Sequence, residues 1–440
     1  MAARQHIRHL LVICLALLSL VACAGAGAPG AVSAPVPTAA TVERGRTVLV
    51  LWHAWPAPRS QVLASLVERY NRSHPSVQVV LQAHSVATIS GDLAQAISEG
   101  GGPHMALLQS HTIGSLAEAG ALLPLDDLVS DADLSQLLAA AVGAARLANT
   151  SGGALYGLPI SFDTLALYYS RANFASAPPS DTNSLLVVAR GLTDTQSDPP
   201  TWGLALNLSL DRTIGYLYAF GGRVFDEQHT LVLGGTGRAG TEAWLSWLVS
   251  LHSDTRILAS TDGITIDHAL MSRQALMTFD WAHALLTYSD LWQEHLGVAP
   301  LPKLSDGNQA PKPYVQSDVI ALNARIGTAE RQATVDFVRY LLSAEAQSGL
   351  LQAGLQPTLI SLDLATVEGV SAPIRAAALV FRSQAEQGLP MPNSREANDL
   401  VWTTLSDMHT NTLRRLLSPA QAVSDADTIL RARLGRMPYP

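Results

Sequence analysis

Few residue patterns in this chain could carry out catalysis. The sequence contains no HExxH pattern for zinc, no GxSxG nucleophile turn and no glycine-rich GKS or GKT loop for phosphate. Hydrolysis of a glycosidic bond needs only two carboxyl groups about 5 to 10 Å apart, and Asp163 and Asp280 could face one another in the folded chain. A hydrolase therefore stays open as an alternative to a protein that performs no chemistry.

Two further patterns are typical of a nucleotide site or a metal site, but the neighbouring sequence lacks the strands or ligands that each site requires. Residues 235–240 satisfy GxGxxG and precede a helix, with Asp254 downstream. The long buried strand and second strand of a dinucleotide unit are missing there, and glycines before a helix also serve turn geometry. His104 and His111 are off the i,i+4 spacing that places two ligands on one helical turn, and no carboxylate partner is near. We expect no cofactor and no metal.

Alternating strands and helices must position any functional residue. The apolar strand Thr47–Trp52, the amphipathic helix Gln61–Arg72 and the strand Val77–Gln82 follow βαβ order, which builds a parallel sheet covered by helices. Beyond Thr358 the pattern is almost wholly helical. Further strands are expected at Met105–Leu108, Leu155–Leu158, Leu165–Tyr169, Trp202–Leu206 and Gly297–Leu301, and helices at Gly91–Ser98, Thr112–Gly120, Gly240–Leu251, Glu330–Leu342, Pro373–Arg382, Arg395–Leu416 and Pro419–Leu434.

The N-terminus has the pattern of an export signal. Arg4 and Arg8 precede the apolar run Leu10–Ala22, which is shorter than the ~20 residues that span a membrane. The run ends at Cys23 in a segment that resembles the bacterial lipoprotein box, so residues 1–22 would be removed and Cys23 would carry the lipid. The only other cysteine, Cys14, lies inside the signal. We expect a protein anchored to the outer face of the cytoplasmic membrane; an ordinary signal with an incidental cysteine is the alternative.

Composition bounds the rest of the chain. Residues 23–46 are mostly small residues and proline, and we expect them to form a flexible tether. Loss of the signal lowers Lys plus Arg from 28 to 26 against 36 acidic residues, which leaves a net charge of −10. The only lysines are Lys303 and Lys312, so no basic surface for nucleic acid is expected. The length after the tether suffices for two domains.

Five segments of the chain carry a further signal, namely Gly102–Leu128, Leu155–Phe174, Ala269–Leu286, Gly297–Pro302 and Asp336–Thr358. The third segment includes a short strand followed by a tryptophan, and the fifth ends in the sequence Gly-Leu-Gln-Pro-Thr. In this order, the five segments resemble those of family 1 extracellular solute-binding proteins of bacterial ABC importers.

This resemblance implies an α/β, two-lobed, periplasmic-binding-protein-like fold. Each lobe would be a sheet flanked by helices, and each would be discontinuous in sequence because the chain crosses a hinge about three times. We expect lobe 1 to comprise residues 47–160 and 300–322, and lobe 2 to comprise 161–299 and 323–440. The crossings are expected near Pro159–Asp163, Pro300–Pro302 and Ser317–Leu322.

The resemblance also implies a function. A protein of this family would be a monomer that binds a carbohydrate, a mono- or oligosaccharide, in the cleft between its lobes and delivers it to ABC permease subunits without altering it. Two alternatives remain, namely a secreted carbohydrate-active hydrolase and a ligand sensor with the same fold.

The site residues follow from matching positions in the family. A sugar needs aromatic platforms for its C–H face and polar groups for its hydroxyls. Trp55 lies in the loop after the first strand, whereas Trp52 completes that strand's apolar pattern. Asp163 would accept sugar hydroxyls or cap a turn, and Asp280 could be a helix N-cap. The predicted ligand contacts are Trp55, Ser110, His111, Phe162, Asp163, Trp281, Gln316 and Ser317. The chain departs from the family at His104, His111 and Thr112, so its relatives' sugar contacts cannot be copied there.

Overall fold

The computed structural model describes residues 45–147, 153–174 and 176–434. The chain divides at Arg46, and Thr47 begins the folded unit described below. The predicted signal, Cys23 and nearly all of the predicted tether lie outside the described residues. No helix in the described ranges is long and apolar enough to cross a membrane.

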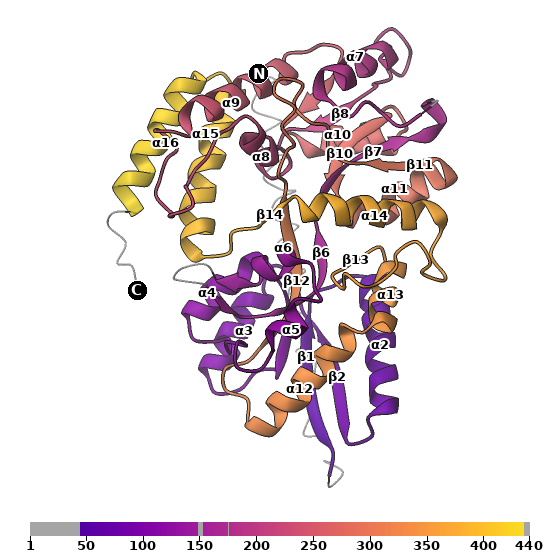
Figure 1. Ribbon diagram of the computed structural model, residues 1–440, viewed down its shortest axis with the longest axis vertical. Helices are drawn as coiled ribbons and strands as arrows, with labels where there is room; N and C mark the ends of the chain where they lie inside the picture. The colour runs from indigo at the N-terminus through magenta and orange to yellow at the C-terminus, as the bar shows by residue number, and fades with distance from the viewer. Residues whose placement is uncertain (1–44, 148–152, 175, 435–440) are drawn as a thin grey trace, which may run out of the picture. The chain divides into compact units, whose positions relative to one another are not determined.

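The larger sheet is mixed, and its strand order is β13-β6-β12-β3-β1-β2, with β14 beside β12 (Figure 1). β1 runs parallel to β2 and β3, as the βαβ pattern predicts, whereas β12 is antiparallel to both β3 and β6. The strands are β1 (Thr47–His53), β2 (Val77–Ala83), β3 (Met105–Gln109), β6 (Leu158–Asp163), β12 (Tyr314–Leu322), β13 (Gln356–Pro357) and β14 (Leu389–Pro390).

Helices around this sheet complete the core of the first lobe. In α2 (Arg59–Ser73), Leu63, Leu66, Val67 and Tyr70 recur at helical spacing and are buried, as their period predicts. The other elements are α3 (Ile89–Ser98), η1 (Ser110–Thr112), α4 (Ile113–Glu118), α5 (Asp131–Leu134), α6 (Ala139–Ala144), β4 (Arg146–Leu147), β5 (Ala154–Leu155), α12 (Thr328–Leu341) and α13 (Ala344–Gln352).

The second lobe is built on a smaller antiparallel sheet of order β10-β7-β11 and a parallel pair, β8 with β9. Its strands are β7 (Leu165–Ser170), β8 (Ala205–Asn207), β9 (Leu258–Ser260), β10 (Met277–Trp281) and β11 (Leu296–Ala299). Its helices are η2 (Arg171–Asn173), α7 (Thr182–Leu192), α8 (Leu210–Ala219), α9 (Arg238–His252), α10 (Gly263–Met271), η3 (Ala282–Ala284), α11 (Leu285–Trp292), η4 (Gln293–His295), α14 (Ala372–Glu386), the π-helix η5 (Ala397–Trp402), α15 (Thr403–Leu413) and α16 (Pro419–Leu434).

In the described residues, the chain passes between the two cores three times. The first passage lies between Ile160 and Leu165. The expected crossing at Pro300–Pro302 is wrong, because Leu301 still packs in the second core. The return is made by β12, from Tyr314 in the second core to Val319 in the first, and the last passage follows Leu355.

The position of α12 and α13 differs from the predicted lobe boundaries. Residues 323–440 were assigned to lobe 2, yet Val335, Phe337, Val338 and Leu341 of α12 are buried in the first core. Leu350 of α13 packs there as well. The apolar face of α12 contacts β1, so the second stretch of the first lobe continues from β12 through α13 rather than ending at residue 322.

The GxGxxG segment has a packing role. A Cβ on Gly237 would lie 2.2 Å from the carbonyl oxygen of Arg223, and a Cβ on Gly240 would lie 2.2 Å from the backbone nitrogen of Gly222. Close approach of α9 to the turn at residues 221–223 therefore requires both glycines. The first glycine, Gly235, has no atom nearer than 3.6 Å.

We expect Gly240→Ala to destabilise the protein by about 1 to 3 kcal/mol, because the added methyl group forces backbone apart in a packed interface. Chemical denaturation monitored by tryptophan fluorescence measures the loss. Gly235→Ala is the matched control, since its methyl group meets only ordinary contact distances. Equal stability of the two variants would contradict this packing role.

Candidate functional site

The strands that pass between the lobes bring four of the predicted site residues together. In the register of β6 with β12, Asp163 lies opposite Gln316, and Phe162 lies opposite Ser317. Phe162 and Ser317 are buried, whereas Asp163 and Gln316 remain partly exposed. β6 and β12, which we call the hinge strands, therefore carry one partly exposed predicted pair, Asp163 with Gln316, and one buried pair, Phe162 with Ser317.

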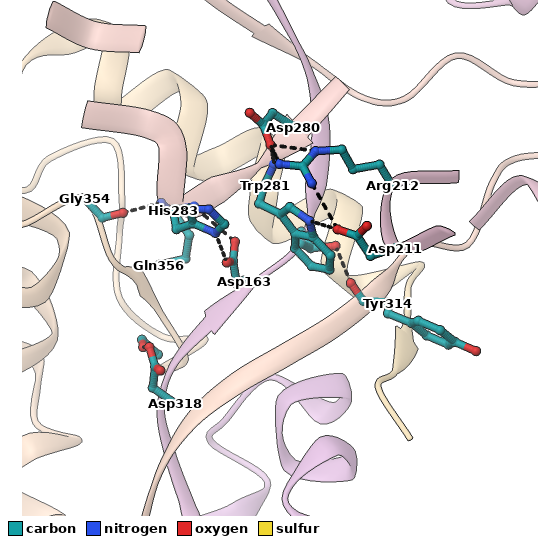
Figure 2. Close-up of polar contacts among 12 residues, drawn as sticks. Asp163, Asp211, Arg212, Asp280, Trp281, His283, Tyr314, Asp318, Gly354 and Gln356 are labelled. Carbon is teal, nitrogen blue, oxygen red and sulfur yellow. Dashed lines mark hydrogen bonds and ion pairs between the residues drawn. The ribbon is translucent and has the colours of Figure 1, made fainter. Parts of the chain in front are cut away.

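Asp163 binds His283, a residue that the sequence did not indicate as part of the site. One carboxylate oxygen accepts the backbone N–H of His283 at 3.1 Å, and the other lies 2.6 Å from the ring Nδ1 of His283 (Figure 2). Burial lowers the pKa of His283, but the hydrogen bond and charge of Asp163 outweigh burial, so the pKa is raised overall. Asp163 thus holds the start of η3 rather than the turn into β7.

A side chain of the first lobe reaches the same segment. Arg59, at the start of α2, donates from Nη2 to the carbonyl oxygen of His283 at 3.3 Å. Trp55, in the loop before α2, is partly buried against the first core. Trp52 is held within its strand, because its Nε1 donates to Gln82 Oε1 at 2.6 Å and its ring packs on His84. Trp55, which binds Asp318 of β12, and Arg59 at the start of α2 therefore lie toward the hinge.

Trp281 is fixed by a polar network in the second lobe. Its indole Nε1 donates to Asp211 Oδ2 at 2.9 Å (Figure 2). Its carbonyl oxygen accepts from the hydroxyl of Tyr168 at 3.0 Å. Its side chain is only 6% exposed. The ring is therefore held in one orientation at the end of β10, with little of its surface open.

Asp280 is not an N-cap but half of a buried ion pair. Arg212 donates to Asp280 Oδ1 from Nη2 at 2.8 Å and from Nε at 3.2 Å (Figure 2). Tyr288 donates to Asp280 Oδ2 at 2.9 Å. The backbone N–H of Trp281 donates to the same Oδ1. Both carboxylate oxygens of Asp280 are thus engaged by donors of the second lobe.

Ser110 and Ser317 bind each other rather than facing outward. The backbone N–H of Ser317 donates to Ser110 Oγ at 3.1 Å, and Ser317 Oγ donates to the carbonyl oxygen of Ala141 at 3.2 Å. Both residues are almost fully buried. They tie β12 to η1 and α6, which is a structural role.

His104 and His111, which lie at the two ends of β3, have different surroundings. His104 Nδ1 accepts the backbone N–H of Val50 at 3.0 Å and so bridges β3 to β1. In His111, burial lowers the pKa, and the buried Nδ1 lacks a hydrogen-bond partner. Its carbonyl oxygen accepts from Asn398 at 2.7 Å. Across the part of the chain that the structure describes, no three or more His, Cys, Asp or Glu residues are placed to hold a metal ion.

Comparisons with known proteins agree with this architecture. A maltotriose-binding protein of Pyrococcus abyssi (strain GE5 / Orsay) is 28% identical over 301 residues, which are 68% of this chain and 63% of that protein. The match therefore spans less than two thirds of the relative's length.

Solved structures share the fold. The maltose/maltodextrin-binding domain from Bdellovibrio bacteriovorus, bound to maltotriose, is 21% identical with a TM-score of 0.71, covering 88% of this chain and 100% of that one. The Thermus thermophilus maltotriose-binding protein, also bound with maltotriose, is 24% identical with a TM-score of 0.68 and the same coverage. These matches confirm the predicted two-lobed α/β fold of the periplasmic-binding-protein type.

The family is shown by a longer match. Residues 65–375, well over half of the sequence, match the model of a bacterial extracellular solute-binding protein. This range includes Asp163, His283 and both hinge strands, so the features described above fall within it. The chain therefore belongs to the family of bacterial extracellular solute-binding proteins.

Proposed function

We propose that this chain binds a carbohydrate, a mono- or oligosaccharide, between its lobes and delivers it unchanged to the permease subunits of an ABC importer. The observation that carries the proposal is the meeting of both lobes at the hinge strands. There Asp163 holds His283, Arg59 reaches the same residue from the first lobe, and Trp55 and Gln316 lie on the adjoining segments.

The chemistry of these groups suits a sugar. Carboxylate and amide oxygens accept hydrogen bonds from hydroxyl groups, and an indole packs against the C–H face of a pyranose ring. The protein would close on its ligand as the lobes rotate about β6 and β12, which is how a hinged protein reports occupancy to a partner. The matched relatives are named for binding maltotriose or maltodextrin, which supports this ligand class.

Export and anchoring belong to the same proposal. Residues 1–22 would be the signal, Cys23 would carry the lipid, and residues 23–46 would let the folded unit move above the membrane. A lipid with a single acyl chain gives only marginal membrane binding, whereas the diacylglycerol on Cys23 would supply two acyl chains. The family's extracellular description supports export.

The proposal is tested by thermal denaturation of the wild-type chain with glucose, maltose, maltotriose, cellobiose, xylobiose and lactose. A saccharide at ~100 times its dissociation constant should stabilise the folded state by ~2.7 kcal/mol. Asp163→Ala should weaken binding by about 10- to 100-fold, because a hydrogen bond to a charged group is worth about 1.5 to 3 kcal/mol. Asp127→Ala, which removes an exposed carboxylate of the first lobe, is the control.

Product analysis of the same incubations separates binding from hydrolysis. We expect every saccharide to be recovered intact. Cleavage products that depend on Asp163 would overturn the proposal in favour of a hydrolase, and no stabilisation by any saccharide would overturn the ligand class.

A further inference from the structure

β6 is irregular at the point where it leaves the first lobe. Its register with β12 shifts between Asp318 and Val319, so Ile160 of β6 has no partner in β12. On the other side β6 pairs with β13, which ends at Pro357, one residue before Thr358 would lie opposite Ile160. A bulge of this kind leaves one residue outside the ladder and bends the strand. The backbone groups there need other hydrogen-bond partners.

One side chain from α13 takes the place of the missing backbone pairing. Gln347 is fully buried, and its Nε2 donates to the carbonyl oxygen of Ile160 at 2.9 Å. Its Oε1 accepts the backbone N–H of Thr358 at 2.8 Å. The carboxamide therefore joins β6 to the chain after β13 by one donated and one accepted hydrogen bond, as a backbone peptide group would.

The amide of Gln347 has no hydrogen-bonding capacity left over. Its Nε2 also donates to the carbonyl oxygen of Leu341, the last residue of α12, at 2.9 Å. Its Oε1 also accepts the backbone N–H of Leu359 at 3.3 Å. A primary amide has two N–H donors and two acceptor lone pairs, so all four are used. A buried polar group that is fully satisfied in this way holds its neighbours in one arrangement.

A hydroxyl group strengthens the same junction. Thr358 is buried, and its Oγ1 donates to the carbonyl oxygen of Pro159 at 2.8 Å. Its own carbonyl oxygen accepts the backbone N–H of Leu138, just before α6, at 2.9 Å. Gln347 belongs to α13, whose Leu350 packs in the first core. These bonds therefore hold β6 to the first lobe.

The other end of the hinge strands is held separately. Thr164 follows β6, and its Oγ1 donates to the carbonyl oxygen of Tyr314, which packs in the second core, at 3.1 Å. Residues 161–163 of β6 and 315–318 of β12 lie between the two sets of bonds. A few residues absorb the change of backbone dihedral angles when hinged lobes rotate. These two short segments are the ones left to do so.

We propose that Gln347 is a positioning residue for lobe closure, whose amide replaces one backbone pairing at the first-lobe end of β6 and confines bending to residues 161–163 and 315–318. Without this amide, β6 and the chain at Thr358 would separate, and bending would extend into the first lobe. This inference goes beyond the proposed function, because it concerns the resting arrangement of the lobes and applies without any ligand.

Distances between the lobes of the ligand-free protein test this inference. Cys14→Ser and Cys23→Ser remove the only cysteines of the full-length chain. Spin labels on Gln95→Cys in α3 and Ala243→Cys in α9, both exposed sites, then report the interlobe distance distribution by pulsed electron paramagnetic resonance. Gln347→Met keeps the length of the side chain but removes its hydrogen-bonding groups, so we expect a broader distribution with a shifted mean.

Two further variants separate the hinge from a general loss of stability. Thr358→Val keeps the shape of the side chain and removes only the bond to Pro159, so it should broaden the distribution less. Gln384→Met is the matched control, because Gln384 is also buried and accepts the backbone N–H of Leu301 at 2.8 Å within the second lobe. A merely structural role of Gln347 would lower the melting temperature of both glutamine variants without changing either distribution.

Each outcome decides for or against the inference. A folded Gln347→Met variant with the wild-type distribution overturns it, and so does equal broadening in Gln384→Met. If Gln347→Met does not fold, Thr358→Val decides, and a distribution identical to that of the wild type overturns the inference. A wild type that binds no saccharide contradicts the proposed function but leaves these distances, and the inference drawn from them, unaffected.

Discussion

Replacement of Arg212 by methionine is expected to lower the free energy of unfolding by about 3 to 5 kcal/mol. Asp280 is only 8% exposed, and Arg212 is its cationic partner, with Nη2 at 2.8 Å from Oδ1. Without Arg212 the carboxylate stays buried with an uncompensated charge. Arg212 also pairs with Asp211, which orients the Trp281 indole, so the loss should extend to the end of β10.

Urea denaturation monitored by tryptophan fluorescence measures this effect. Arg238→Met is the matched control, because the Arg238–Glu242 pair lies on the surface of α9 at i,i+4 spacing and is worth about 0.3 to 0.5 kcal/mol. The double variant Arg212→Met with Asp280→Asn should recover part of the loss, since it removes the unpaired charge. A loss below about 1 kcal/mol in the single variant would show that the ion pair is not needed for stability.

Acid is expected to destabilise the protein through His409 between about pH 6.5 and pH 4. His409 is 2% exposed on α15, near Thr213 and the ring of Trp244. Burial lowers its pKa from 6.5 to about 4. The unfolded chain therefore takes up a proton as the pH falls through 6.5, while the folded chain takes it up only near pH 4. The loss reaches about 3 kcal/mol at and below pH 4, at 1.36 kcal/mol per pKa unit.

The measurement is the slope of stability against pH, from urea denaturation at half-unit steps. His409→Gln removes the titrating group, so its slope between pH 6.5 and 4 should be smaller than that of the wild type by up to about 1.4 kcal/mol per pH unit. The slope is informative even if the variant is less stable at pH 7. His268→Gln, on the exposed face of α10, controls for the loss of a histidine. Identical slopes for wild type and His409→Gln would contradict a neutral, buried His409.

Much of the local structure was predictable from spacing along the chain. The strands expected at Thr47–Trp52 and Val77–Gln82 are β1 and β2 within one residue, and the helix at Gln61–Arg72 is α2. Period-2 and period-3.6 burial patterns arise within a few residues, so no distant contact is needed to recognise them.

Elements that depend on distant partners were placed less well. The nine-residue strand β12 lies between β3 and β6, and its neighbours are some 150 to 200 residues away in sequence. The sequence indicated only a hinge crossing within it. Likewise α12 was correctly expected near Glu330–Leu342 but was assigned to the wrong core, because an amphipathic pattern specifies a buried face without specifying what covers it.

The candidate site divides in the same way. Resemblance selected Asp163, Trp281, Trp55 and Gln316 by position, and the absence of common catalytic motifs followed from the residues themselves. Resemblance could not select His283, because its bond to Asp163 joins residues 120 apart in sequence. Nor could it select Asp318, which binds Ser161 across 157 residues.

By itself, the sequence determined the order of strands and helices, the apolar faces they bury and the kinds of side chain available to a ligand. Only the tertiary structure decided that Asp280 is neutralised by Arg212, that Ser110 and Ser317 bind each other, and that Ser161, Asp163, Gln316 and Asp318 share one face. The physical reason is that local patterns are fixed by the geometry of the backbone over a few residues. The partner of a polar side chain is instead fixed by the register in which two distant strands pair, and a shift of one residue would turn every one of these side chains to the opposite face.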